Sequence, residues 1–458
     1  MKVWELENEE HDKLREKIES FTAGTDVQYD MKLKNFDLLG SVAHVTGLED
    51  IGILSKTEST TLKTELVNLL KEDLELSARD EDIHSKIEKV LAQRLGDLGK
   101  KVHTGRSRND QVLVDLRLFT KQKIFEITEE ILQLAKTLIR LATTHRHTPM
   151  VGYTHTRKAM PSSVGLWSAA YVESMLENLI PLKATYKLAN LCPLGAGAGY
   201  GVPLKLNREL TAKLLGFDEP QINPITVMNS RGKYEFNLLS ALGNVQLDLS
   251  RIAADLITFS EDTYGFFEIP NEFTTGSSIM PQKQNPDVLE LIRGKASTFF
   301  GQLSSTYPLV AGMRSGYSRD LQEAKAPIFQ GTEITKSSLS VMIPLIENLI
   351  VNEENLLAQF TEEVLATDKA TDLVLEGLPF REAYRQVKGE LSSKQNQETV
   401  SKEQILDALS RRKHTGGPGN LKLGELRERI EIQKSEWEKK EKEHEEALEK
   451  LISGQGSH

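Results

Sequence analysis

The stretch LLSALGNVQLDLSRIAADLITF, residues 238–259, places apolar side chains at alternating steps of four and three residues. They are Leu238, Leu242, Val245, Leu249, Ile252, Leu256 and Phe259. A repeat of about 3.5 residues is typical of helices that pack nearly parallel in a bundle. The same spacing recurs over residues 124–141 and, more weakly toward its end, over residues 289–310. These three segments predict a bundle of long helices.

The rest of the chain fits a helical fold. Shorter helical patterns surround residues 166–180 and 343–357, and no alternating β-branched run ends at an Asn-Gly or Asp-Gly turn. We therefore expect an all-α protein with a central long-helix bundle and smaller helical domains at both ends. The expected boundaries are residues 1–110 for the N-terminal domain, 111–358 for the bundle and 359–458 for the C-terminal domain. The charged tail, residues 425–451, is expected to be a solvated helix or a peripheral coiled segment.

Composition excludes several classes of protein. Of the 458 residues, 39% are hydrophobic and 27% are charged, as in an ordinary globular chain. The formal net charge of -10 leaves no basic excess for nucleic acid. No run reaches the roughly 18 apolar residues of a membrane span, and the first 20 residues contain no apolar signal core. We expect a cytoplasmic chain without a nucleic-acid or membrane partner, and Cys192, the single cysteine, as a small buried side chain.

Polar residues cluster between the expected helices, at 103–111, 152–163, 195–201, 274–287 and 314–325. The glycine-rich segment GAGAGYG (195–201) lacks the Gly-x-Gly-x-x-Gly spacing of a dinucleotide site, and close helix packing explains it better. HExxH, CxxC, P-loop and Gly-x-Ser-x-Gly patterns do not occur in the sequence. We therefore predict no metal and no cofactor, which leaves acid–base chemistry with anion recognition.

The segment GSSIMPQKQNPD, residues 276–287, favours such chemistry. Asn285 is a good helix N-cap, Pro286 suits the first helical position and Asp287 suits the first turn. The N-terminus of this helix and Lys283 would stabilise negative charge that develops beside Ser277. A solvated loop is the ordinary alternative for a segment of this composition.

His155 is the second candidate in proton transfer. Glu290 falls one turn into the helix that Pro286 begins, so its carboxylate could reach an imidazole near the loop. An imidazole that a carboxylate orients and makes more basic is a common proton-transfer unit near neutral pH. Taken alone, His155 is more often a structural histidine, and this alternative stays open here.

Two motifs resemble a known enzyme family. GSSIMPQKQNPDVLELIRGK (276–295) resembles the fumarate-forming lyase superfamily, which includes fumarase, aspartase, adenylosuccinate lyase and argininosuccinate lyase. HTGRSRNDQVLVDLRL (103–118) is similar to the argininosuccinate lyase and delta-crystallin branch. The resemblance extends from about Phe21 to Leu421 and leaves the charged tail uncovered.

The resemblance implies an all-α homotetramer in which each active site draws on three subunits. It implies anti β-elimination of argininosuccinate to fumarate and L-arginine, the last step of arginine biosynthesis, without a cofactor. Ser277 and His155 would lie on the two sides of the proton transfer, and Glu290 would raise the basicity of His155. Lys283 would support the charged intermediate. The implied substrate-binding residues are Asp26, Ser107, Arg108, Asn109, Thr154, Asn285, Tyr317, Gln322 and Lys325.

The roles of base and acid are open on sequence alone. We place Ser277 on the base side, in a lid that closes over the substrate, and His155 on the acid side. Several positions depart from the family pattern: Asp26, Ala196, Gln284, Ala324, and Thr156 with Arg157. A serine is expected at Asp26 and Ala196, a lysine at Gln284, an acid at Ala324, and Leu-Gln at 156–157.

Two rival functions follow from the same resemblance. One is a sibling lyase resembling adenylosuccinate lyase, against which the segment TGRSRND (104–110) argues. The other is a structural protein resembling the delta-crystallins that kept the bundle and lost catalysis. Retention of Ser277, His155 and Lys283 argues against that second reading.

Overall fold

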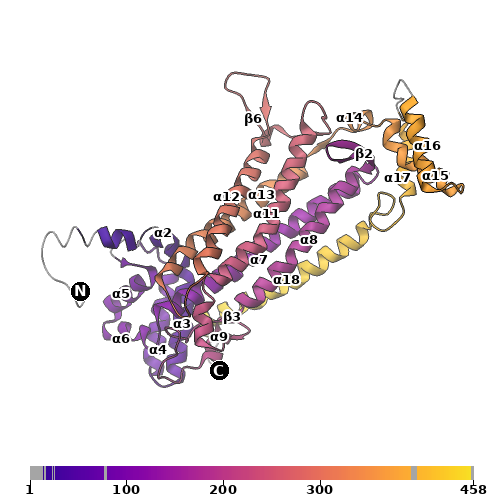
Figure 1. Ribbon diagram of the computed structural model, residues 1–458. Helices are drawn as coiled ribbons and strands as arrows, with labels where there is room; N and C mark the ends of the chain where they lie inside the picture. The colour runs from indigo at the N-terminus through magenta and orange to yellow at the C-terminus, as the bar shows by residue number, and fades with distance from the viewer. Residues whose placement is uncertain are drawn as a thin grey trace.

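Helices dominate the computed structural model, which describes residue 14 and residues 17–22, 24, 26–76, 80–393 and 400–454. The molecule is elongated, with a central bundle of long helices between smaller helices at its two ends (Figure 1). Every described strand belongs to a two-stranded pair. The predicted all-α class with a central bundle is confirmed.

The bundle consists of α7 (Arg108–Thr144), α8 (Val164–Ala189), α11 (Lys233–Ser260), α12 (Asp287–Val310) and α13 (Lys325–Glu347). Helix α7 packs against α8 and α13, and α11 packs against α8, α12 and α13. The three apolar repeats predicted from the sequence, here called seams, lie in α7, α11 and α12. Residues such as Leu249 and Phe299 in these seams are fully buried. Burying each of these side chains stabilises the fold by roughly 1.5–3 kcal/mol.

A glycine sets how closely α13 approaches the bundle. A Cβ atom added at Gly331 would lie 2.3 Å from Leu239 Cδ2 in α11 and 3.2 Å from Phe299 Cε2 in α12. Because interiors are close-packed, any larger residue at this position would force these helices apart.

The N-terminal end of the molecule is a helical region built around α3. Its elements are α2 (Asp26–Asp30), η1 (Met31–Leu33), α3 (Lys34–Asp50), α4 (Lys56–Leu70), α5 (Ile83–Leu95), α6 (Asp97–Lys100) and η3 (Lys101–His103). Helix α3 packs against α4, α5 and α7, so it joins this region to the bundle. A capping box at Ser55 starts α4, and the Asp82 side chain caps α5.

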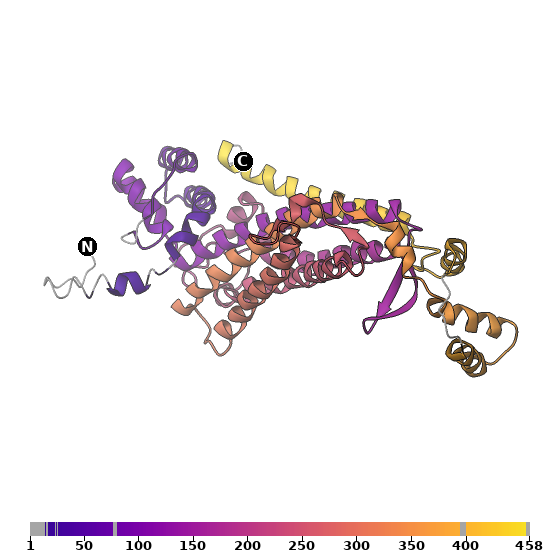
Figure 2. The same ribbon diagram turned by 90° about the horizontal axis from the view of Figure 1, so that it is seen from above.

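The opposite end carries the C-terminal helices and a hairpin. The helices are α14 (Glu353–Ala358), η6 (Glu362–Leu365), α15 (Ala366–Leu375), α16 (Phe380–Ser393) and α17 (Lys402–Arg411). Strands β1 (Pro149–Thr154) and β2 (Arg157–Ser163) form the hairpin, which the sparse strand signals did not predict. Figure 2 shows that this hairpin projects away from the bundle axis.

The charged tail is a helix, as predicted, but it is not fully solvated. Helix α18 (Leu423–Ser453) runs back along the bundle and packs on α7, α8 and α3 (Figure 1). Ile430, Trp437 and Leu451 are buried on its inner face. The domain division at residue 359 stays a prediction. Helix α18 lies after it in the sequence but packs on the bundle, because its apolar stripe covers the bundle helices.

The shorter elements are connections: β3 (Leu191–Cys192), α9 (Arg208–Leu214), β4 (Glu219–Pro220), α10 (Pro224–Asn229), β5 (Phe267–Glu268), η4 (Asn271–Phe273), β6 (Thr275–Gly276), β7 (Gln284–Asn285), η5 (Arg319–Ala324) and β8 (Ile350–Val351). The helix predicted over 343–357 is interrupted, because α13 ends at Glu347 and the Asn352 side chain caps the new helix α14.

Cys192 is buried, as predicted, and burial raises the pKa of its thiol to about 11. Among the described residues, no helix combines the length and apolar character that crossing a membrane requires.

Candidate active site

A polar cavity of about 250 Å³ lies where the N-terminal helices meet the ends of the bundle helices. Its lining includes six of the predicted substrate-binding residues: Asp26, Arg108, Asn109, Tyr317, Gln322 and Lys325. These come from three distant parts of the chain, which are α2, the start of α7, and the segment leading into α13. The fold therefore brings together residues that the sequence motifs identified separately.

The start of α7 is held rigidly. The Ser107 hydroxyl accepts a hydrogen bond from the Asn109 backbone N–H at 3.3 Å, and the Ser107 N–H donates to Asp110 Oδ1 at 2.9 Å. Asp110 Oδ2 also accepts from the backbone N–H groups of Gly195 and Gly197, at 3.1 and 2.9 Å. Burial outweighs these bonds and raises the pKa of Asp110 to about 6. Ser107 thus acts as the N-cap that orients Arg108 and Asn109.

The glycine-rich segment differs in part from its predicted role in helix packing. Gly195, Gly197, Gly199 and Gly201 all have positive φ angles, so the backbone itself requires glycine. Close packing contributes as well, since a Cβ at Gly199 would lie 2.7 Å from Met228 Cγ.

Lys325 anchors another wall of the cavity. Its Nζ donates to Asp26 Oδ2 at 2.9 Å and to Asp30 Oδ1 at 2.7 Å. Burial raises the pKa of Asp26, although the ion pair with Lys325 opposes the shift. The Gln322 side chain donates to the Thr22 carbonyl at 3.0 Å. The serine-to-aspartate departure at position 26 therefore places a carboxylate beside the predicted binding lysine.

The lining carries both charges. Arg108, Arg231, Arg319 and Lys325 supply cations, while Asp26, Glu81 and Asp82 supply anions. Arg108 Nη1 pairs with Asp82 Oδ2 at 2.5 Å. A cavity of this kind suits a small molecule that has both carboxylates and cationic nitrogen groups.

Sequence reasoning missed Glu81, Asp82, His84, Arg231 and Arg319 in this lining. The run DEDIHS (80–85) holds three acids and a histidine at the start of a helix, and that run could have marked Glu81, Asp82 and His84. The segment around Arg231 has no such signal, because only folding places it at the cavity.

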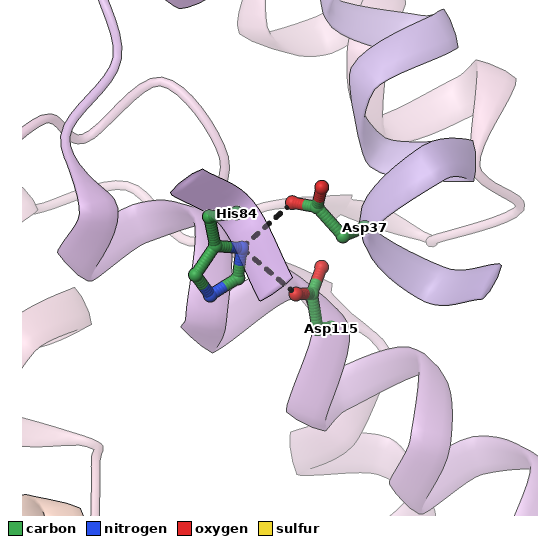
Figure 3. Close-up of side chains that lie close together, drawn as sticks. All are labelled: Asp37, His84 and Asp115. Atoms are coloured by element: carbon green, nitrogen blue, oxygen red, sulfur yellow. Dashed lines mark hydrogen bonds and ion pairs between the residues drawn. The ribbon is translucent and has the colours of Figure 1, made fainter. Parts of the chain in front are cut away.

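A buried trio adjoins the cavity, formed by Asp37, His84 and Asp115 (Figure 3). The donor atoms of the trio lie within 4.8 Å of one another, close enough for a cation site. His84 Nδ1 lies 2.9 Å from Asp37 Oδ1 and 3.7 Å from Asp115 Oδ2, which are hydrogen-bond and ion-pair distances. Charges on Arg106 and Lys325 also act on Asp115. We interpret the trio as a His84–Asp37 hydrogen bond with the Asp115 carboxyl at ion-pair distance.

The segment with Ser277 lies elsewhere, at the far end of α12 (Figure 1). Strands β6 and β7 close the loop through the pairs Thr275–Asn285 and Gly276–Gln284. The partly exposed Ser277 accepts hydrogen bonds at Oγ from the N–H groups of Ile279 and Met280, at 3.3 and 3.1 Å. All its hydrogen bonds among the described residues are thus local to the loop.

The predicted helix cap at Asn285 is wrong. Asn285 belongs to β7, and Pro286, which has no capping side chain, occupies the N-cap position of α12. Asp287 lies in the first turn, as predicted, and accepts a hydrogen bond from Thr275. The helix N-terminus still faces the loop that carries Ser277 and Lys283.

His155 and Thr154 occupy the hairpin tip. Thr154 pairs with Arg157, so His155 and Thr156 form a two-residue turn, with φ angles of 51° and 60°. Positive φ at both positions is typical of the hairpin turn whose twist matches the strands. His155 is exposed, and within the described part of one chain it does not contact Glu290, which is itself exposed on α12.

Four of the departures have local explanations. Ala196 is buried with Leu113, Val227 and Met228, an apolar cluster that a serine hydroxyl would disturb. Ala324 is buried too, where an acid would need a partner. Gln284 donates to Asn271 Oδ1 at 2.7 Å, and Arg157 is exposed at the hairpin tip.

Comparison with known proteins matches the family model described as Lyase to residues 10–301. The argininosuccinate lyase of Sorangium cellulosum is 42% identical over 415 residues, 90% of this chain and 95% of that protein. The argininosuccinate lyase of Thermotoga neapolitana is 40% identical over 81% of this chain and 94% of that protein. The crystal structure of EDDS lyase in complex with formate has a TM-score of 0.79 at 26% identity, covering 93% of this chain and 92% of that one.

Proposed function

The chain belongs to the argininosuccinate lyase family, and from this premise we propose how its residues carry out the family reaction. The protein is a carbon–nitrogen lyase that converts argininosuccinate to fumarate and L-arginine. Its place is the last step of arginine biosynthesis, in the cytoplasm. No cofactor is needed, because the elimination requires only acid–base groups and electrostatic support.

One observation carries this proposal: six of the predicted substrate-binding residues line a single cavity, whose walls hold both positive and negative side chains. Argininosuccinate has carboxylates, an amino group and a guanidinium, so it needs anionic and cationic partners close together. Lys325 and Arg108 would bind carboxylates, and Asp26 would accept hydrogen bonds from a cationic nitrogen. Asn109, Tyr317 and Gln322 would supply neutral hydrogen bonds.

Each active site would combine residues from several copies of the chain in a homotetramer. Helix α12 has 24 residues, so its ends lie about 36 Å apart at 1.5 Å per residue. Ser277 and Glu290 are at one end of that helix, and Tyr317 follows the other end. The β1–β2 hairpin and the β6–β7 loop also project from different places in Figure 1. Side-by-side packing of bundles from different subunits would bring these parts together.

The chemistry needs a base and an acid on opposite faces of the substrate. The base removes the proton beside a carboxylate, and its electron pair becomes the double bond of fumarate as the C–N bond breaks. The departing guanidino nitrogen takes a proton from the acid and leaves as arginine. We assign Ser277 as the base and His155 as the acid, with Glu290 of another subunit orienting the imidazole.

The loop of Ser277 would serve as a lid. Its described side chains Ile279, Met280 and Lys283 are exposed in the single chain, so they are available to a substrate or a neighbouring subunit. With the lid closed, Lys283, Asn285 and the N-terminus of α12 would stabilise the dianionic carboxylate formed on proton removal. Losing one such donor costs roughly 3 kcal/mol of barrier.

Fumarate release, followed by ultraviolet absorbance with the purified protein, tests this function. Argininosuccinate, adenylosuccinate and aspartate are run in parallel. Release from argininosuccinate alone is expected. Release from adenylosuccinate would favour the sibling lyase, and silence with all three in a folded tetramer would favour a structural protein.

A further inference from the structure

His84 forms part of the cavity wall, and neither the sequence motifs nor the proposed chemistry assigns it a role. It lies in the first turn of α5, two residues after the N-cap Asp82, and it is 4% exposed. His84 lines the cavity, and its ring faces two buried carboxylates, those of Asp37 in α3 and Asp115 in α7 (Figure 3).

The two carboxylates fix one edge of the ring. Burial alone would raise the pKa of Asp37, but the charges of His84, Arg106 and Arg108 outweigh burial and lower it. An ionised carboxylate only accepts, so His84 Nδ1 carries the proton and donates to Asp37 Oδ1 at 2.9 Å. Burial, followed by the charge of Asp37, raises the pKa of Asp115 well above its usual range. Within the described chain, neither Asp115 oxygen has a hydrogen-bond partner.

The opposite edge of the ring is unpaired. In Figure 3 the second ring nitrogen, Nε2, points away from both carboxylates. It makes no hydrogen bond to the described residues, and it is not among the buried unpaired atoms of that part of the chain. Because Asp37 bonds only Nδ1, Nε2 can form a hydrogen bond with a molecule in the cavity.

His44 shows what a purely structural histidine looks like in the same region. It is 2% exposed in α3, and its Nε2 donates to the Thr104 carbonyl at 2.8 Å. His44 does not line the cavity. The two buried histidines therefore differ in the feature that matters, which is whether Nε2 is already paired within the protein.

We propose that His84 is a further substrate-binding residue whose Nε2 donates a hydrogen bond to a carboxylate of the substrate. The proposal rests on the proposed function. A carboxylate at Nε2 would place the ring between two anions, so both nitrogens would donate. Arg108, Arg231 and Arg319 line the same cavity and would attract the anion. Carboxylates on the succinyl part and on the arginine part of the substrate offer the same chemistry.

Steady-state kinetics of His84→Asn and His84→Leu, beside His44→Asn, test the proposal with argininosuccinate as substrate. Asparagine retains an amide near the Nδ1 position and can still donate to Asp37, whereas leucine fills the space without a donor. Both variants remove the Nε2 donor, so either one that folds decides the question. Melting temperature and tetramer size are measured for each.

We expect KM to rise roughly 10- to 100-fold in the His84 variants, as for loss of a charged hydrogen bond, with kcat much less affected. His44→Asn should melt earlier but keep its KM. An unchanged KM in a folded His84 variant would overturn the proposal. Wild-type protein without lyase activity would instead overturn the proposed function. Product inhibition identifies which carboxylate His84 binds. Weaker inhibition by fumarate in His84→Asn would indicate a carboxylate of the succinyl part, and weaker inhibition by arginine would indicate the carboxylate of the arginine part.

Discussion

Arg108 is the first residue of α7, and His155 lies in the hairpin turn that follows the last turn of the same helix. The 37 residues of α7 extend about 55 Å along the helix axis, from Arg108 to the end that leads into the hairpin. One small substrate cannot contact both within a single chain. The geometry of α7 therefore supports an active site assembled from different subunits, and each part can be tested separately.

Ser277→Ala tests the proposed base. We expect kcat for argininosuccinate to fall roughly 10²–10⁴-fold, because the hydroxyl that takes part in proton transfer is gone. The fold should be unchanged, since the Ser277 hydrogen bonds are confined to its own loop. Ser278→Ala, the neighbouring hydroxyl, is the matched control and should retain most of the activity. Equal losses in the two variants would remove Ser277 from the mechanism.

Asp26→Asn tests the carboxylate at position 26, where the family pattern has a serine. The substitution removes a carboxylate that lines the cavity, while Lys325 keeps its partner Asp30 at 2.7 Å. We expect KM to rise about tenfold or more with a smaller change in kcat, because a cationic group of the substrate loses its charged acceptor. Asp50→Asn, an exposed site bonded to Asn207 at 2.9 Å, is the control. A KM that stays the same or falls would show that Asp26 does not bind the substrate.

Lys121 should make stability depend on pH. Its Nζ is buried against the Phe217 ring and donates to the Gly216 carbonyl at 2.5 Å, and burial lowers its pKa to about 7. The unfolded chain holds this proton up to about pH 10. Between those values the unfolded state binds more protons, so this group makes stability rise with pH. Below pH 7 the cost of the buried cation is complete.

Replacing that lysine with a neutral side chain measures the effect. Lys121→Met should raise the melting temperature relative to wild type more at pH 6 than at pH 9. Lys123→Met is the matched control, because Lys123 is partly exposed and pairs with Glu126 at 2.8 Å. The same difference from wild type at both pH values would contradict the assignment.

Thr156→Gly tests backbone strain at the hairpin tip. A β-branched residue with a φ of 60° is strained, and glycine adopts that angle freely. We expect the free energy of unfolding in denaturant to rise by roughly 0.5–1 kcal/mol. Thr154→Gly, in the extended strand β1, should lower it. A loss of stability in Thr156→Gly would mean that the threonine side chain makes contacts that outweigh its strain.

Local repeats in the sequence were enough to predict the bundle. The seams of α7, α11 and α12 are visible because each helix buries one continuous stripe, and burial dictates residue type at every third or fourth position. The stripe of α18 was missed since its few apolar residues, such as Trp437, are diluted by charge. The β1–β2 hairpin was missed because its turn uses His155 and Thr156 in place of glycine or asparagine.

The candidate site shows a similar division. Arg108, Asn109 and Lys325 were predicted because they lie in segments that resemble the family. Those segments did not include His84, which the run DEDIHS could have marked, or Arg231, which reaches the cavity only through tertiary packing. The cap expected at Asn285 failed for a related reason, since pairing with Thr275 in the β6–β7 ladder took precedence over local capping preference.

Complementation between two inactive variants tests the composite site most directly. His155→Asn and Ser277→Ala are each purified, shown to be inactive with argininosuccinate, then mixed in equal amounts, unfolded and refolded together. If each site takes these residues from different subunits, random mixing restores about one quarter of the sites, and activity should recover to that order. Each variant refolded alone is the control and should stay inactive. A refolded mixture of mixed tetramers that remains as inactive as its parents would contradict the account.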